Sequence, residues 1–214
     1  SASSFISEKT TFSFSGNKKY TPKNYNDKYA DGPLSMAAAI AYSDNIYAVK
    51  THLFLGEDVL VDTMRLMGLD QNLNATPSLA LGASDINMLD YAEAYATLAS
   101  NGEHNKLYFI NRIEDMNGNL LYIRNDDGRQ VLDESLTYII NESLTNTYNY
   151  NYIDYNSPTV IYLNGKMSKK YALKSGTTDN DFWISGYNKD ALMLVWAGND
   201  NNNKVSKNYS KIIK

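Results

Sequence analysis

The spacing of apolar residues predicts several helices in this 214-residue chain. Apolar positions three and four residues apart mark one face of an amphipathic helix. Pro33 suits the first turn of a helix, Gly68 suits a helix end, and Ser84 or Asp85 suits a capping position. The helices predicted in this way cover residues 33–42, 46–55, 59–67, 85–99 and 133–144.

Shorter apolar runs bounded by turn residues predict strands, mostly in the last third of the chain. Asn117-Gly118 lies between two such runs and is the strongest short-range hairpin signal. Asn188-Lys189-Asp190 is expected to close a second antiparallel hairpin. The predicted strands cover residues 11–14, 107–114, 120–124, 171–175, 182–187 and 191–197.

The order of these elements predicts the fold class. Most helices come first and three strands joined by short turns come last, which indicates an α+β fold rather than a βαβ array. We expect an antiparallel β-sheet flanked by helices, with a helical subdomain. Residues 1–32 are polar and turn-rich, and the Asn- and Tyr-rich tract 146–156 is predicted to be a loop.

Composition excludes several classes of function. Hydrophobic content of 43% and charged content of 21% are ordinary for a globular domain. The net charge of −4 and the lack of a long basic run argue against a nucleic-acid partner. No apolar stretch in these residues reaches the roughly 18 positions needed to span a bilayer. The absence of cysteine excludes disulfides, thiolate metal sites and a cysteine nucleophile.

Two polar motifs carry the chemistry that stands out. Lys174-Ser175-Gly176-Thr177-Thr178 follows an apolar run, and its lysine, hydroxyls and glycine suit an anionic group held beside a reacting carbonyl. Ser43-Asp44-Asn45 separates two predicted helices. A purely structural interpretation also exists for each: Ser43 as the N-cap of the helix from Ile46, and the lysine motif as a strand ending in a polar turn.

The serine motif alone has little specificity, since Ser-x-Asn recurs at Ser15-Gly16-Asn17 and Ser206-Lys207-Asn208. The two motifs together, in this order and about 130 residues apart, resemble the second and third motifs of the penicillin-recognising serine acyltransferases. The similarity extends from about residue 5 to residue 200 and resembles the transpeptidase domain of class A, bifunctional penicillin-binding proteins. Further strings that carry it are residues 20–25, 46–50, 77–84, 92–97, 182–187 and 195–200.

The resemblance implies a reaction and a role for each motif residue. A serine would attack the D-Ala-D-Ala amide of a peptidoglycan stem peptide, and an amine would resolve the acyl-enzyme. By analogy Ser43 relays a proton, Asn45 holds a substrate amide, and Lys174 supplies positive potential and a hydrogen bond to Ser43. The expected substrate-binding residues are Ser175, Gly176, Thr177 and Thr178, where Thr177 N–H would be one oxyanion donor.

The nucleophile of the family stands in a Ser-x-x-Lys sequence at the start of a buried helix, where this spacing places both residues on one face. The chain contains one Ser-x-x-Lys, at Ser15-Gly16-Asn17-Lys18. We reject it because Gly16 and Asn17 are poor helix formers and Pro22 follows closely. Residues 1–214 are therefore expected to be the C-terminal portion of one transpeptidase domain, inactive alone, with the nucleophilic serine, a glycosyltransferase domain and a membrane anchor upstream of Ser1.

The resemblance also implies partners and a location. Stem peptides and β-lactam antibiotics are the expected ligands, other cell-wall synthesis proteins are candidate partners, and action is expected at the extracytoplasmic face of the bacterial membrane. Neither a metal nor a cofactor is expected, because His52 and His104 stand apart from any set of ligand residues. A non-catalytic scaffold or sensor, or a carboxypeptidase, β-lactamase or class B relative, stays open as an alternative. Tyrosines 148–155 are interpreted as groove-lining residues or as a solvated loop.

Overall fold

The computed structural model describes residues 4–69, 71, 73–125 and 128–205. The helices are α1 (Met36–Tyr42), α2 (Asn45–Leu55), α3 (Glu57–Leu66), α4 (Met88–Ala99) and α5 (Glu134–Leu144). The strands are β1 (Ser4–Ser7), β2 (Phe12–Phe14), β3 (Lys18–Tyr20), β4 (Gly32–Ser35), β5 (Glu103–His104), β6 (Arg112–Glu114), β7 (Leu120–Ile123), β8 (Arg129–Gln130), β9 (Ala172–Thr177), β10 (Phe182–Tyr187) and β11 (Leu192–Ala197).

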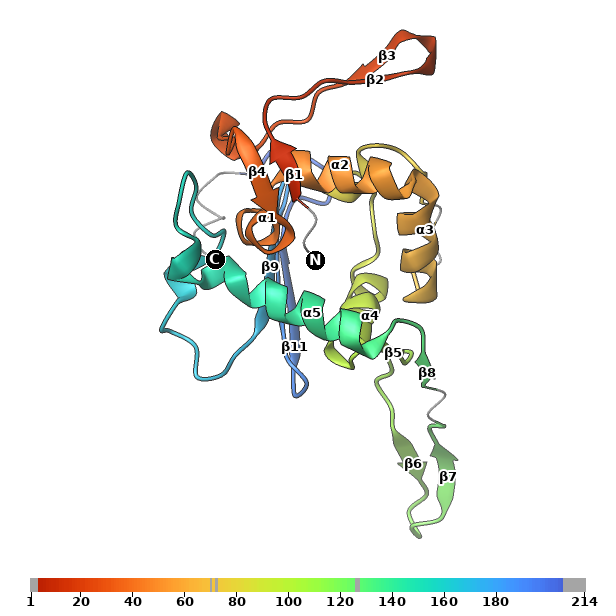
Figure 1. Ribbon diagram of the computed structural model, residues 1–214. Coiled ribbons are helices and arrows are strands. Elements are labelled where there is room, and N and C mark those ends of the chain that lie inside the picture. Colours follow the sequence, from red (N-terminus) through yellow and green to blue (C-terminus); the bar gives the residue numbers. More distant parts are fainter. Residues whose placement is uncertain (1–3, 70, 72, 126–127, 206–214) are drawn as a thin grey trace.

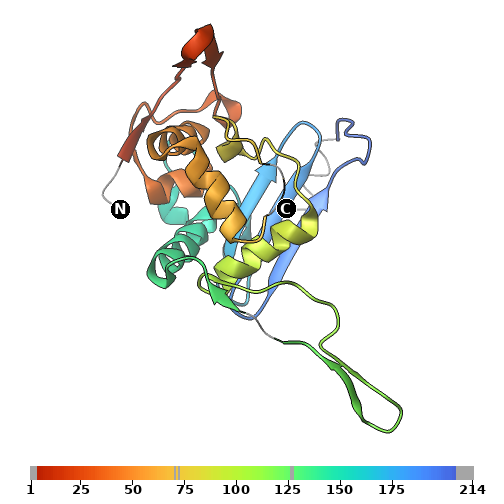
Figure 2. The same ribbon diagram turned by 90° about the vertical axis from the view of Figure 1, so that its right-hand side faces the viewer.

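The last three strands form the largest sheet. They pair antiparallel in the order β11-β10-β9, so β9 is an edge strand. The turn after β10 is closed by Asn188 N–H, which donates to Ala191 O at 3.0 Å. Helices α4 and α5 lie against this sheet (Figures 1 and 2). The predicted α+β fold and the three predicted C-terminal strands are confirmed.

A buried aromatic cluster joins the two helices to one face of the sheet. Tyr95 of α4 lies 5.6 Å from Tyr187 of β10, measured between ring centroids, and both are buried. Leu144 of α5 and Ala172 of β9 complete the buried group. Aromatic side chains bury large apolar areas, so this contact contributes strongly to the attachment of the helices.

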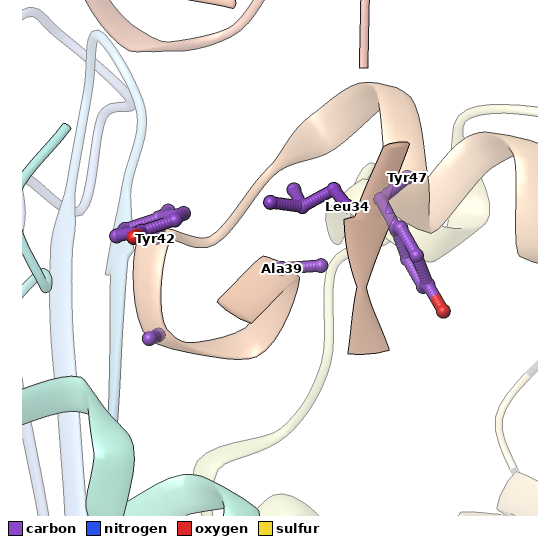
Figure 3. Close-up of a cluster of buried hydrophobic side chains, with 5 residues drawn as sticks. Leu34, Ala39, Tyr42 and Tyr47 are labelled. Atoms are coloured by element: carbon purple, nitrogen blue, oxygen red, sulfur yellow. The ribbon is translucent and has the colours of Figure 1, made fainter. Parts of the chain in front are cut away.

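A second core lies where the chain enters α1. It consists of buried side chains from β4, α1 and the start of α2, and Figure 3 shows Leu34, Ala39, Tyr42 and Tyr47 from this group. Tyr152 and Tyr155, from the connection between α5 and β9, pack against it. This core therefore fixes the end of α1 relative to the segment that leads into β9.

The chain around Pro33 corrects one prediction. Residues 33–35 belong to strand β4, which pairs antiparallel with β1 so that Pro33 lies opposite Ile6. Proline lacks an N–H and fits the edge of a small sheet as well as a first helical turn. Ser35 is the actual N-cap, and its side chain accepts a hydrogen bond from Ala38 N–H. The first helix therefore begins at Met36 rather than at Pro33.

The start of α4 corrects a second prediction. The helix begins at Met88, and its N-cap is Asn87, whose side chain accepts from Leu89 N–H at 2.8 Å. The capping ability of Ser, Asp and Asn is similar, so composition alone did not distinguish Ser84 or Asp85 from Asn87. The end of the helix at Asn101-Gly102 is confirmed, since both residues have positive φ.

Two hairpins project from opposite ends of the molecule (Figures 1 and 2). One is β2–β3, whose first strand was predicted. The other is the β6–β7 ribbon (residues 112–123), which turns at Gly118 as expected. Strand β6 is shorter than the predicted 107–114, because Leu107 N–H bonds to the Glu93 carboxylate instead of a partner strand.

The tract 146–156 contains short 3-10 turns, Thr145–Tyr148 and Tyr150–Tyr152, within a non-repetitive connection. Among the described residues, no helix combines the length and the apolar character needed to cross a membrane.

Candidate active site

The edge of β9 exposes backbone groups at alternate residues. Thr178 N–H donates to Asp181 O across the turn to β10. Because hydrogen-bonded and non-bonded pairs alternate in antiparallel sheets, the backbone N–H and C=O groups of residues 173, 175 and 177 face away from β10. The side chains of Thr147 and Lys174 indeed donate to Leu173 O and Ser175 O. Thr177 N–H therefore points out from the open edge of the sheet.

Lys174 connects this edge to the helical part of the molecule. Its Nζ donates to Ser43 Oγ at 2.8 Å and to Ser175 O at 2.5 Å. The lysine side chain is partly buried, and its strand position is fixed by pairing with Ser185 of β10. The two motifs predicted to act together thus meet in one hydrogen bond, across 131 residues of sequence.

Ser43 has a left-handed backbone conformation, with φ 53° and ψ 51°. It is the C-cap of α1, and its N–H donates to Ile40 O at 3.2 Å. The structural interpretation of Ser43 as the N-cap of the next helix is wrong, because Asp44 has that position and accepts from Tyr47 N–H at 2.8 Å. The left-handed turn leaves the Ser43 hydroxyl available to Lys174 instead of to the helix.

Asp44 is buried and strongly hydrogen-bonded. Its Oδ2 accepts from Ser7 Oγ at 2.5 Å, from Asn24 Nδ2 at 2.6 Å and from Tyr155 Oη at 3.2 Å. A buried carboxylate is tolerated when its oxygens are bonded in this way. Burial, followed by the nearby charge of Asp44, raises the pKa of the Tyr155 phenol. Asp44 therefore connects the short turn Ser43–Asn45, called here the serine turn, to three separate segments.

Asn45 begins α2 and is held by the segment that precedes β4. Its backbone N–H donates to Asn24 Oδ1 at 2.8 Å, and its side-chain Nδ2 donates to Lys23 O at 2.7 Å. The side-chain amide nitrogen of Asn45 is thus hydrogen-bonded within the protein. The side-chain Oδ1 is the atom of Asn45 that can accept a hydrogen bond from a ligand.

The other residues of the lysine motif differ in position. Ser175 is buried and Thr177 is exposed, both in β9. A Cβ atom added at Gly176 would lie 3.2 Å from Trp183 Cβ, so a side chain there would require a small shift of Trp183. The Thr178 hydroxyl accepts from Asn180 N–H and Asp181 N–H and belongs to the turn after β9.

The rejected Ser15 lies in the β2–β3 hairpin, which projects away from α1 and β9 in both views (Figures 1 and 2). It starts a 3-10 turn between β2 and β3, at the tip of a projecting hairpin (Figure 1), and is exposed. Gly16 and Asn17 have positive φ and interrupt any helix there. The third Ser-x-Asn copy, Ser206–Asn208, lies outside the described residues.

The two histidines have structural contacts. His52 is buried and its Nε2 donates to Thr76 O at 3.0 Å. His104 Nε2 lies 3.3 Å from Glu93 Oε1, and its Nδ1 lies 3.3 Å from Thr97 Oγ1. In the part of the chain that the structure describes, no group of three or more His, Cys, Asp or Glu residues is arranged to hold a metal ion.

Sequence reasoning missed the residues that support the serine turn. Ser7, Asn24 and Tyr155 all bond to Asp44, and Asn24 also bonds to Asn45. Asn24 lies in the string 20–25 that carried part of the resemblance, which was the available signal for it. Tyr155 was among the tyrosines interpreted as groove-lining or solvated, and nothing in its local sequence indicates a bond to residue 44.

Comparison with known proteins identifies the family of this chain. A family model described as penicillin binding protein transpeptidase domain matches residues 2–213. Penicillin-binding protein 2D of Bacillus subtilis (strain 168) is 39% identical over 212 residues, which are 97% of this chain and 31% of that protein.

Solved structures share the fold. The 2.6 Å crystal structure of penicillin-binding protein 1A from Haemophilus influenzae has a TM-score of 0.86 at 24% identity, over 95% of this chain and 35% of that one. The PonA1 protein from Mycobacterium tuberculosis in complex with penicillin V has a TM-score of 0.72 at 20% identity, over 94% and 56%. The chain thus spans about a third of its Bacillus and Haemophilus relatives. It belongs to the penicillin-binding protein transpeptidase domain family.

Proposed function

We propose that the protein containing this chain is a peptidoglycan D,D-transpeptidase. It would cross-link stem peptides by acyl transfer from D-Ala-D-Ala through a serine acyl-enzyme, and β-lactams would acylate the same serine. The observation that carries the proposal is the 2.8 Å hydrogen bond from Lys174 Nζ to Ser43 Oγ beside the open edge of β9. This bond brings a cation and a hydroxyl together beside the edge strand of the sheet.

Each site residue has a proposed role that the family resemblance implies and that its position supports. Ser43 relays a proton towards the leaving amine, and Lys174 keeps its hydroxyl polarised by donating to it. Asn45 accepts a substrate amide N–H through Oδ1. Thr177 N–H, which faces the open edge, donates to the developing oxyanion.

The substrate carboxylate is proposed to lie at the end of β9. The positive charge of Lys174 attracts it, and the exposed Thr177 hydroxyl donates to it, with Ser175 beside them in the strand. Gly176 lets the substrate backbone approach, because no side chain extends from the strand there. Thr178 contributes by closing the turn that follows the strand.

The attacking serine is proposed to come from a segment outside residues 1–214. This proposal is supported by the exposed hairpin position of Ser15, which lacks a helix for its lysine. The same upstream region would supply a membrane anchor and a glycosyltransferase domain and would hold the enzyme at the extracytoplasmic face of the membrane. Stem peptides, β-lactams and other cell-wall synthesis proteins are the proposed partners.

A fluorescent penicillin tests the proposal on the full-length product of the gene. We expect covalent labelling of that protein and none of the isolated 214-residue chain. Lys174→Met should slow labelling by about a hundredfold or more, the usual range for loss of a group that assists proton transfer.

Lys170→Met is the matched control. Lys170 precedes the same strand but pairs with Glu142 on the surface, so its loss should leave the labelling rate unchanged. Absence of labelling in the full-length protein would overturn the transpeptidase proposal and favour a non-catalytic scaffold. An adduct on the 214-residue chain that disappears in Ser15→Ala would overturn the location of the nucleophile.

A further inference from the structure

Tyr155 contacts the residues on both sides of Ser43. Its ring packs edge-on against Tyr42, with centroids 5.1 Å apart and an interplanar angle of 72°. Its hydroxyl donates to Asp44 Oδ2 at 3.2 Å. One side chain, 111 residues away in sequence from Asp44, therefore spans the backbone of the serine turn.

The segment that carries Tyr155 is itself attached to the end of α1. Thr159 N–H donates to Ala41 O at 3.0 Å, and Val160 N–H donates to Thr147 O at 2.9 Å. Val160 is fully buried. Residues 155–160 thus follow the last turn of α1, and the chain then continues into β9 and Lys174.

The serine turn requires such support because of its backbone. Ser43 has a Cβ atom and yet occupies the left-handed region, at φ 53°. For a serine this conformation costs about 1–2 kcal/mol, and it persists where surrounding contacts offset that cost. The bonds to Asp44 and the ring contact on Tyr42 fix the peptides before and after Ser43.

We infer that Tyr155 is a positioning residue that holds the serine turn in the left-handed conformation, so that Ser43 Oγ stays within hydrogen-bond distance of Lys174 Nζ. The ring limits movement of Tyr42, and the phenol limits movement of Asp44. The catalytic consequence of this positioning rests on the proposed function, whereas its structural consequence does not.

Two readouts on the full-length protein test the inference. Tyr155→Phe removes the hydroxyl and keeps the ring. We expect hydrogen–deuterium exchange of peptides covering residues 42–47 to become about ten- to a hundredfold faster, as for loss of one hydrogen bond to a carboxylate. We expect the limiting rate of acylation by a β-lactam to fall about fivefold, while the saturation constant for its non-covalent binding stays the same. Tyr155→Leu, which also removes the ring, should have larger effects on both.

Tyr162→Phe is the matched control. Tyr162 lies in the same connection, and its buried hydroxyl has no hydrogen-bond partner among the described residues. Its removal should change neither readout. Exchange at residues 42–47 that is equal in Tyr155→Phe and Tyr162→Phe would overturn the inference, and so would an equal rise in exchange at β9 and β10.

The acylation measurement distinguishes failure of the proposed function from failure of the role inferred for Tyr155. If the wild-type protein is not acylated, the proposed function fails, and the exchange of residues 42–47 alone decides the role of Tyr155. If the wild type is acylated and Tyr155→Phe loses binding affinity but not limiting rate, Tyr155 contacts the ligand instead of positioning Ser43, and the inference fails.

Discussion

The three-stranded sheet and the β6–β7 ribbon both consist of antiparallel strands, but helices cover the sheet whereas the ribbon is exposed to solvent. In the sheet, Phe182 and Tyr187 of β10 are 5% and 1% exposed. In the ribbon, every residue of β7 is exposed, and Leu121 reaches 66%. The β10–β11 hairpin of the sheet and the β6–β7 ribbon both have turn residues of the expected type. Both pair in register, except for one irregularity beside Glu114.

The difference shows which part of a hairpin its own sequence determines. A turn such as Asn117-Gly118 sets the pairing of the two strands that it joins. Burial comes from elements that are distant in sequence, here α4 and α5, which cover the sheet but lie away from the ribbon (Figure 1). The strand that carries the lysine motif therefore depends on α4 and α5 for its rigidity, whereas the ribbon depends only on itself.

The largest expected effect comes from truncating one leucine side chain to alanine in each region. Leu173 of β9 is 5% exposed, and Leu173→Ala should lower the free energy of unfolding by about 2–5 kcal/mol. Leu121→Ala should change it by no more than about 0.5 kcal/mol, because the side chain is already in solvent. Urea denaturation, monitored by the fluorescence of Trp183 and Trp196 in the sheet, measures the free energy of unfolding of each variant. Similar losses in the two variants would mean that the ribbon is covered in solution.

A smaller effect is expected from two left-handed turn residues, one in the ribbon and one in the serine turn that bonds to the sheet through Lys174. Gly118 of the ribbon has φ 82° and Ser43 has φ 53°, so both are left-handed, but only one is glycine. Ser43→Gly should be more stable than Ser43→Ala by about 1 kcal/mol, because both lose the hydroxyl and only glycine relieves the strain.

The ribbon gives the reciprocal experiment. Gly118→Ala should increase amide exchange in the ribbon, because alanine introduces the strain that glycine avoids at φ 82°. The measurements are the free energies of unfolding of the two Ser43 variants and the amide exchange rates of Gly118→Ala. Equal stability of Ser43→Gly and Ser43→Ala would mean that the serine turn stores no strain.

The smallest effect concerns an acid near the turn of each hairpin. Hydrogen bonds from the Asn119 side chain and from backbone N–H groups lower the pKa of Asp115 below its usual 3.8. The hydrogen bond and charge of Lys169 lower the pKa of Asp190 in the same direction. A carboxyl whose pKa is lower in the folded state stabilises that state above its unfolded pKa. This contribution is lost as pH falls below 3.8 through the lower folded value.

The salt dependence of the two pKa values distinguishes hydrogen bonding to neutral groups from attraction by a charge. Raising NaCl from low concentration to about 1 M should shift the pKa of Asp190 upward, because the exposed ion pair with Lys169 is screened. The pKa of Asp115 should move less, because its partners are neutral amides. Carboxyl chemical shifts recorded by NMR from pH 6 to 2 measure both values. An equal salt response would mean that Asp115 is also held by charge.

Local signals predicted much of the fold. The helix predicted over 133–144, the hairpin at Asn117-Gly118 and the three C-terminal strands depend on neighbouring residues and were all found where expected. The errors at Pro33 and at Asn87 arose where one local sequence suits two structures. For Pro33 the choice was made by pairing with β1, which lies 25 or more residues earlier.

The site was predicted less completely. Ser43 and Lys174 were identified from a family resemblance, and no periodicity or spacing would have placed them 2.8 Å apart. The support of the serine turn was not predicted, because Ser7, Asn24 and Tyr155 reach Asp44 from three segments that only the folded chain brings together.

The bond from Lys174 to Ser43 also sets an order of events during biosynthesis. The two residues are 131 positions apart, so at about 5–20 residues per second roughly ten seconds separate their synthesis. Loop closure over such a distance costs about 4 kcal/mol, which is only about 0.6 kcal/mol more than closure of a loop half as long. Non-local contacts of this kind nevertheless form slowly. The Lys174–Ser43 pair is therefore completed late in folding, and a nascent chain interrupted before β9 carries the serine without its lysine.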